Sequence, residues 1–409
     1  MTDTPTLFDD AFSTNGAVTE PPEELQTKPL GECAMLRSGS TPRRSNDENW
    51  GGDIPWVSAK SLHRFLIDDA KEYVTETGAS KARIMPKDTV LVLVRGMRLA
   101  KEFPVGITQT SVTFNQDVKA LTPKEGVDPL YLAYALKATE DRAMNWSSKT
   151  THGTLRLTTP RLKELPIPVL SLEKQRRIAS LLGDWDRALA QTDALLEAKR
   201  ERLRGLRQRL LDGGERFPAF DAPWKKRTLG NVFAEREDTG NGHLDLLAVT
   251  MDEGVIRRDQ LDRRDTSSSD KSDYQRAAAG DLVYNSMRMW QGVSGIAREE
   301  GIVSPAYTVC IPGDDVEASF IRHLFRHPPV VNLFRRYSQG LTSDTWKLRF
   351  EHFAQIEVGM PPLEEQRRIA AVLDTAEAEI HRLKQKRAAL KRQKKGLMQR
   401  LLTGPVRTV

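Results

Sequence analysis

The feature that most constrains how this 409-residue chain folds is an internal repeat. Residues 172–213 return as residues 363–404, without a gap. Both copies open on Leu-Glu-x-Gln-Arg-Arg-Ile-Ala and both end on Gln-Arg-Leu-Leu-x-Gly. A repeated segment implies a repeated structure, and overlooking it would misassign the whole fold.

Apolar residues inside both copies follow the alternating 4-3 spacing of a coiled-coil seam, from Ile178 to Leu210 and from Ile369 to Leu401. Prolines precede the copies and glycines follow them, which suits helix starts and stops. We therefore expect two long helices that pair with each other; the alternative is that each packs into a separate globular core. Polar residues interrupt the seam, and the basic ones among them are weak points that could admit another subunit: Lys199, Arg387 and Lys394.

A glycine lies inside each predicted helix, at Gly205 and Gly396, where it costs about 1 kcal/mol relative to alanine. Its duplication suggests either a close-packed contact at this point or a helix that ends early.

The chain outside the repeat has a mixed α+β character, because short β-branched runs alternate with turn residues and with helical periodicity. We expect two globular domains of related but different sequence, each followed by a long helix. The predicted boundaries are a disordered acidic tail, a first domain, a first helix, a second domain and a second helix with the C-terminal end, at 1–27, 28–165, 166–214, 215–356 and 357–409.

Charge is distributed unevenly along the chain. The net charge is only +6, yet the first 27 residues carry six acids and no base, whereas the two repeat copies carry an excess of Lys and Arg. Two cysteines are too few for a disulfide framework or a four-thiolate metal site. No apolar run is long enough to span a membrane and no secretory signal is evident, so we expect a soluble, cytoplasmic protein.

The doubled order of domain and helix, with Leu-Glu-x-Gln-Arg-Arg-Ile-Ala opening each helix, resembles the specificity subunit of type I restriction–modification systems. Smaller features agree: Gly39-Ser40-Thr41-Pro42, followed by Trp50 and Ile54-Pro55-Trp56, is similar to the opening of a target-recognition domain in that family. The resemblance covers about residues 28–404 and leaves only the acidic tail outside it.

The resemblance implies two target-recognition domains separated by an antiparallel intramolecular coiled coil, with a pseudo-twofold repeat. Each domain would read one half of an asymmetric, bipartite double-stranded DNA target. Two methyltransferase subunits, which bind S-adenosylmethionine and methylate adenine, would dock on the helices. A restriction and motor subunit, using ATP and Mg²⁺, would join for cleavage. The chain itself would bind no cofactor and catalyse nothing.

The sequence contains no convincing motif of a catalytic, phosphate-binding or metal-binding site. Ser304-Pro305-Ala306-Tyr307 approaches a methyltransferase tetrapeptide but has alanine in place of the second proline, and a turn before a strand is the simpler interpretation. No phosphate-binding Gly-rich loop is present. His323 and His327 lack a third ligand at metal-binding spacing, and Cys33 and Cys310 are most simply core residues. The sequence therefore predicts no metal site.

DNA readout requires basic, amide and hydroxyl side chains on exposed loops. The stretches Arg95–Lys101 and Arg288–Gln291 are the strongest candidates because they follow predicted strands at similar places in both domains. The candidate DNA-binding residues are Arg43, Arg44, Lys60, Arg95, Arg98, Lys101, Lys149, Thr151, Arg257, Arg258, Arg288, Trp290, Gln291, Ser343 and Lys347. Arg156 and Lys347 match across the repeat, which favours a role common to both halves.

The identical residues that open the helices are candidates for the seat of a partner subunit or for a structural role. They are Gln175, Arg176, Arg177, Gln366, Arg367 and Arg368. A second function remains open at this point: a coiled-coil scaffold that binds proteins without DNA sequence specificity. A third, an autonomous DNA-modifying enzyme, is disfavoured by the missing motifs.

Overall fold

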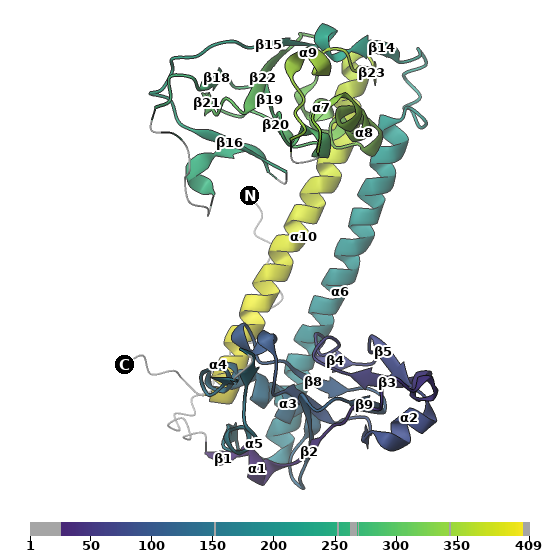
Figure 1. The fold of residues 1–409 in the computed structure, drawn as a ribbon, viewed down its shortest axis with the longest axis vertical. Coiled ribbons are helices and arrows are strands. Elements are labelled where there is room, and N and C mark those ends of the chain that lie inside the picture. The colour runs from purple at the N-terminus through teal and green to yellow at the C-terminus, as the bar shows by residue number, and fades with distance from the viewer. Residues whose placement is uncertain are drawn as a thin grey trace, which may run out of the picture. The chain divides into compact units, whose positions relative to one another are not determined.

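The computed structural model describes residues 26–150, 153–251, 253–261, 268, 270–342 and 345–403. Two compact units make up the chain: unit 1 is Met1–Ala190 with Ala388–Val409, and unit 2 is Gln191–Arg387. Each unit takes one part of both long helices, α6 (Leu172–Leu211) and α10 (Leu363–Thr403), which are drawn in Figure 1. The α+β class and the two predicted repeat helices are confirmed. Apart from its last two residues, the predicted tail 1–27 lies outside the described residues.

Unit 1 is built around a five-stranded sheet in the order β2-β10-β7-β8-β4 and a four-stranded sheet in the order β5-β3-β9-β6. Its strands are β1 (Thr27–Pro29), β2 (Ala34–Ser38), β3 (Trp50–Val57), β4 (Leu66–Ile67), β5 (Glu72–Val74), β6 (Ile84–Met85), β7 (Val90–Leu93), β8 (Val105–Thr108), β9 (Val112–Phe114), β10 (Val118–Pro123), β11 (Ser148–Lys149), β12 (Leu155–Arg156) and β13 (Pro166–Pro168). All four residues of β7 are buried, as a β-branched run at the centre of a sheet requires.

Short helices complete unit 1. They are α1 (Leu30–Cys33), α2 (Glu76–Lys81), α3 (Pro129–Ala138), α4 (Glu140–Asn145) and α5 (Thr159–Lys163), with 3₁₀ turns η1 (Asp47–Asn49) and η2 (Met97–Ala100). Helix α3 begins where the Asp128 side chain accepts a hydrogen bond from the Tyr131 N–H, with Pro129 as its first residue. Its residues 131–136 are buried in the same core as β7.

The described residues of unit 2 form a four-stranded sheet in the order β15-β22-β19-β20 and three two-stranded sheets. Its strands are β14 (Lys225–Thr228), β15 (Phe233–Glu235), β16 (Leu247–Thr250), β17 (Gly254–Arg257), β18 (Gln275–Ala277), β19 (Leu282–Asn285), β20 (Ser294–Ile296), β21 (Gly301–Val303), β22 (Tyr307–Pro312) and β23 (Glu357–Met360). Its helices and 3₁₀ turns are α7 (Ala318–Leu324), α8 (Pro328–Tyr337), α9 (Phe350–Phe353), η3 (Leu229–Asn231), η4 (Arg258–Gln260) and η5 (Met289–Gln291). Aromatic side chains fill the core, where Phe353 contacts Phe233, Tyr284 and Phe325.

The two units share a frame at the start of each long helix. In unit 1, β1 pairs antiparallel with β13, which precedes α6; in unit 2, β14 pairs antiparallel with β23, which precedes α10. The first strand of each domain is thus hydrogen-bonded to its last strand. This pairing closes each domain on itself at the base of its helix, and it explains why both copies of the repeat begin in the same way.

The helix segments pair within each unit. In unit 2, Leu196, Leu203 and Leu210 of α6 share a buried cluster with Ile369 and Leu373 of α10. In unit 1, Leu182 of α6 and Leu402 of α10 belong to one core. The predicted pairing of the two helices is therefore present in both units.

The basic residues in the seam between the two helices all form ion pairs. Lys199 pairs with Glu379, and Arg387 pairs with Asp193, both inside unit 2. Lys394 pairs with Asp186 inside unit 1. The expectation that these residues could admit another subunit is corrected, because each cation already has an acidic partner on the opposite helix segment.

The duplicated glycines do not mark a close contact. Both helices continue through them, and a Cβ added at Gly396 would meet no atom within 4 Å. Both expectations for this pair were wrong. Among the described residues, no helix combines the length and apolarity needed to cross a membrane.

Candidate nucleic-acid interface

Two loops that are far apart in the sequence meet in unit 1. The turn η2 follows the central strand β7, and the hairpin of β11 and β12 lies against it. The Leu157 N–H donates a hydrogen bond of 2.9 Å to the Val94 carbonyl, and Arg95 and Arg156 are antiparallel bridge partners. The structure therefore brings together residues from two of the loops predicted to bind DNA.

The residues at this junction form what we call the unit 1 basic cluster: Arg95, Lys119, Lys149 and Arg156. Arg95, Lys149 and Arg156 are exposed, and within the described part of the chain no acidic side chain pairs with them. Lys119 lies on the neighbouring strand β10, where burial and the charge of Arg156 lower its pKa. Unpaired like charges repel one another. Such a cluster is suited to a polyanion such as the DNA backbone, which would supply the missing negative charge.

Unit 2 repeats this arrangement with different side chains. The Leu348 N–H donates a hydrogen bond of 2.8 Å to the Ser286 carbonyl, which follows β19 as Val94 follows β7. A bridge between Gln339 and Lys347 forms the counterpart of the β11–β12 hairpin. The turn η5 and this hairpin thus meet as η2 and its hairpin do in unit 1.

Aromatic residues dominate the junction in unit 2. Trp290 of η5 and Trp346 of the hairpin are half-buried and lie edge-to-face, with ring centroids 5.4 Å apart. The Arg335 guanidinium lies 5.3 Å from the Trp346 ring centre. Arg288 and Lys347 are exposed beside them. The two units therefore present the same backbone arrangement with different chemistry.

Three predicted DNA-binding arginines are engaged inside their own units. Arg98 donates to the carbonyls of Ala59 and Leu62, both at 2.9 Å, and to Glu102. These bonds hold the loop of Lys60 against η2.

The other two arginines are held by acids. Arg44 pairs with Glu72 and covers the Trp50 and Trp56 rings, and this hydrogen-bonded pairing raises its pKa. Arg257 pairs with Asp245 at 2.9 Å. For these arginines the structure favours a structural role over base contact.

The other candidates keep the status of predictions. Arg43, Lys60, Lys101, Gln291 and Lys347 are exposed, and Arg258 is half-buried in η4. Thr151 and Ser343 lie outside the described residues. Sequence reasoning missed Lys119 and Arg335, because one sits in a buried strand and the other in a helix, and neither carries a local signal of a loop site.

The glutamines proposed as part of a partner seat have a different role. Gln175 accepts a hydrogen bond from the Asp128 N–H and donates to the carbonyls of Gly126 and Leu170. Gln366 makes the equivalent three bonds in unit 2, to Glu317, Asp315 and Pro361.

These glutamine side chains are only 4% and 1% exposed. Each ties the start of a long helix to the N-terminus of α3 or α7. Their assignment to the partner seat is corrected, because no surface of either side chain is left for a partner.

The arginines beside them are exposed. Arg367 pairs with Glu364 and Glu317, and Arg368 lies 5.8 Å from the Phe217 ring. Arg176 and Arg177 are exposed on α6. A partner seat formed by these four arginines remains a prediction.

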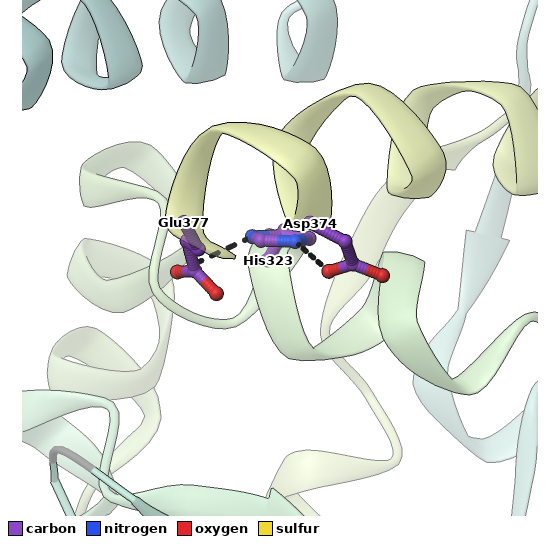
Figure 2. Close-up of side chains that lie close together, drawn as sticks. All are labelled: His323, Asp374 and Glu377. Atoms are coloured by element: carbon purple, nitrogen blue, oxygen red, sulfur yellow. Dashed lines mark hydrogen bonds and ion pairs between the residues drawn. The ribbon is translucent and has the colours of Figure 1, made fainter. Parts of the chain in front are cut away.

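One group of side chains has the composition of a metal site. Figure 2 shows His323 of α7 lying between Asp374 and Glu377 of α10. The His323 Nε2 is 2.8 Å from an Asp374 oxygen. However, Arg322 pairs with both carboxylates and Arg207 pairs with Glu377. Two guanidinium groups repel a cation and take up the carboxylate oxygens, so this group is better described as an ion-pair network joining α6, α7 and α10 inside unit 2.

Protonation of His323 is disfavoured in this network. Burial lowers its pKa below the ordinary value, and the charges of Arg322 and Arg207 act in the same direction, against the hydrogen bond to Asp374 and the charge of Glu377. Burial opposes ionisation of Asp374 as well, but hydrogen bonds from His323 and Ser319 bring its pKa to about 2. At neutral pH Asp374 is therefore ionised and His323 is neutral.

We expect unit 2 to lose stability as the pH falls below about 6.5. In that range His323 is protonated in the unfolded chain, whereas its lowered pKa disfavours protonation in the folded chain. One proton limits this contribution to about 1.4 kcal/mol per pH unit. The substitution His323→Gln should remove it, measured as the free energy of urea unfolding at pH 7.5 and 5.5. His381→Gln, on an exposed position of α10, is the control. Equal pH dependence in wild type and His323→Gln would refute the assignment.

The residues examined for catalysis have structural roles. Ser304 accepts a backbone hydrogen bond from Tyr307 at 2.9 Å in a turn that opens β22, as predicted. Cys33 and Cys310 are buried free thiols, and burial raises the pKa of both. Both cysteines are therefore core residues, and thiolate chemistry is disfavoured at either.

Comparison with known proteins gives consistent results. Residues 22–198 and 316–392 match the family described as "Type I restriction modification DNA specificity domain". The Escherichia coli "Type I restriction enzyme EcoR124I/EcoR124II specificity subunit" is 30% identical over 166 residues, which cover 40% of this chain and 41% of that protein. The match thus spans about two fifths of the relative's own length.

Two solved structures have a similar fold over nearly the whole chain. The type I restriction–modification S subunit from M. genitalium has a TM-score of 0.60 at 14% identity, covering 94% of this chain and 98% of its own. A chain from a study of "complex assembly" and "conformational transition of the type I R-M system" has a TM-score of 0.55 at 16% identity, covering 92% and 97%. At these identities the similarity concerns the fold alone.

Proposed function

Since the chain belongs to the type I restriction–modification specificity family, whose members are non-catalytic DNA-recognition subunits, we propose that it recognises an asymmetric, bipartite sequence in double-stranded DNA. Each unit reads one half of the target. The chain directs adenine methylation and restriction by partner subunits and carries out neither reaction itself.

The observation that carries this proposal is the repeated junction of turn and hairpin. Equivalent backbone hydrogen bonds, from Leu157 to Val94 and from Leu348 to Ser286, form it in both units. Exposed cations surround it in both, yet the remaining side chains differ. A shared frame with different side chains is what two readers of different sequences require, because phosphate contacts position a protein on DNA and side chains at base edges specify the sequence.

The proposed partners supply the chemistry. Two methyltransferase subunits would bind S-adenosylmethionine, and a restriction and motor subunit would use ATP and Mg²⁺, all in the cytoplasm. The exposed arginines that open α6 and α10 are the proposed seat for the methyltransferases, because they are identical in both copies of the repeat.

The test is base-resolution mapping of methylated adenine in cells that co-express the chain with its matching methyltransferase subunits. We expect one asymmetric motif with two specified halves and an unspecified gap. Replacing residues 28–165 with those of a relative should change one half only. A change in both halves would contradict independent readers.

The alternative, a protein-binding scaffold, predicts a different result. The purified complex would bind DNA without sequence preference, and mapping would yield no motif. Competition between a mapped target and a scrambled duplex of the same length separates the two, because a specific reader prefers its target by a factor of about 10³ or more.

A further inference from the structure

The junction in unit 2 carries several apolar side chains that are not fully buried. Trp290 and Trp346 are half-buried there, Met287 is 46% exposed and Leu341 is 101% exposed. Exposed apolar residues that gather on one surface, rather than scatter singly, usually mark a site of interaction. The corresponding junction in unit 1 has the basic cluster and no tryptophan: Leu155 lies at the position of Trp346, and Met97 of η2 is the large apolar side chain exposed beside it, at 64%.

The backbone holds this surface in a fixed form. The Trp290 Nε1–H donates to the Met287 carbonyl at 3.1 Å, so its polar group is used inside the unit. Gly292, which ends η5, has φ +81°, and a Cβ there would lie 2.9 Å from the Phe325 carbonyl oxygen. At Gly340 in the hairpin, with φ +150°, an added Cβ would lie 2.6 Å from the Thr345 carbonyl oxygen. Only glycine fits at these two positions, and the tryptophans are held where the turn and the hairpin meet.

The arrangement of the rings limits what they can contact. Arg335 lies over the Trp346 ring, and the Trp290 ring stands at 84° to it. A base therefore finds one Trp346 face already covered, which disfavours stacking on that face. The exposed remainder is apolar and rigid, and cations border it at Arg288 and Lys347. The surface combines an apolar centre with a positive margin.

DNA offers one apolar group at a base edge in the major groove, the C5-methyl of thymine. We propose that the Trp290–Trp346 pair contacts a thymine methyl in the half-site read by unit 2, while Arg288 and Lys347 hold the flanking phosphates. This inference rests on the proposed function and goes beyond it, because it assigns a base and a mode of readout to one unit.

The test replaces each thymine of the mapped target with deoxyuridine, which lacks only the methyl group, and measures binding by the full chain with its methyltransferase partners. We expect a loss of about fourfold at one or two positions, the factor for removing one buried methyl from water contact (~0.8 kcal/mol). Those positions should lie in the half that is unchanged when residues 28–165 are replaced. Deoxyuridine in the other half of the target should not weaken binding in a way that the Trp346→Ala variant abolishes.

The protein variants Trp346→Ala and Trp346→Phe complete the experiment. In Trp346→Ala, deoxyuridine at the sensitive position should cause no further loss, and Trp346→Phe should keep part of the effect. The inference is overturned if no thymine is sensitive, if the half-site of unit 2 contains no thymine on either strand, or if sensitivity persists in Trp346→Ala. The deoxyuridine scan uses the unaltered protein, so it remains decisive even if Trp346→Ala does not fold. Failure of the unaltered complex to prefer its target would instead refute the proposed function.

Discussion

Replacing Glu365 with alanine should destabilise unit 2 by about 3–5 kcal/mol, the usual cost of removing one partner from a buried ion pair. The Glu365 side chain is fully buried and accepts two hydrogen bonds from Arg216, at 2.9 and 2.7 Å, and one from Trp224 at 3.2 Å. Arg216 lies in the segment between α6 and β14 and is itself only 20% exposed. The substitution removes the acceptor of the Arg216 Nε and Nη2 groups and of the indole N–H, and leaves the guanidinium only its bond to the Ala222 carbonyl among the described residues. Urea unfolding of the full chain, followed by tryptophan fluorescence, measures the loss.

The neighbouring residue provides the control. Glu364 is 71% exposed and, among the described residues, forms an ion pair only with Arg367, one helical turn away. Glu364→Ala should cost under about 1 kcal/mol, including the favourable position of an acid in the first turn of α10. Glu365→Gln, which keeps an acceptor oxygen but loses the charge, should fall between the two. Equal losses for Glu364→Ala and Glu365→Ala would show that the buried pair does not hold this segment.

The repeat and its helices could be predicted because their signal is local and periodic. A 3.5-residue spacing of Leu and Ile over forty residues has few structural solutions, and the helices begin at Leu172 and Leu363 as expected. The strand pairing that closes each domain could not be predicted in the same way. Pairing of β1 with β13 joins residues that the sequence separates by a whole domain, and no local pattern encodes such a contact.

The candidate site was predictable as a set of loops but not residue by residue. Arg95 and Arg98 lie three positions apart after the same strand, and composition cannot distinguish them. The structure does, because the Arg98 guanidinium reaches two carbonyls of another loop while Arg95 remains exposed. Glu365 presents the same difficulty, since its counterpart in the first copy is Lys174 and the repeat offers no hint of a buried carboxylate. Tertiary contacts decide which polar side chains are hydrogen-bonded inside a unit and which stay exposed, and only the exposed ones are available to bind DNA.

Removing three charges from the unit 1 basic cluster should weaken DNA binding about 100-fold at 0.15 M salt. The variant Arg95→Ala/Lys149→Ala/Arg156→Ala loses three exposed cations that have no acidic partner among the described residues. Each phosphate contact adds about 0.9 to the slope of log affinity against log salt, which corresponds to about fivefold at this concentration. We therefore also expect the slope to fall by up to about 3. Titrations of the mapped target from 0.05 to 0.3 M salt measure both quantities.

A matched triple variant separates local contact from net charge. Arg83→Ala/Lys87→Ala/Lys163→Ala removes the same charge from exposed positions of unit 1, and Lys87 precedes β7 whereas Arg95 follows it, so the two lie at opposite ends of that strand. This control should change the affinity less than about threefold and leave the slope nearly unchanged. The cluster variant should be no less stable to unfolding than wild type. Relief of the repulsion between Arg95 and Arg156 compensates for the contacts that are lost when the side chains are shortened to alanine. Equal weakening by both variants would mean that unit 1 attracts DNA only through its overall charge, and the junction of η2 with its hairpin would then lose its place as the reading surface.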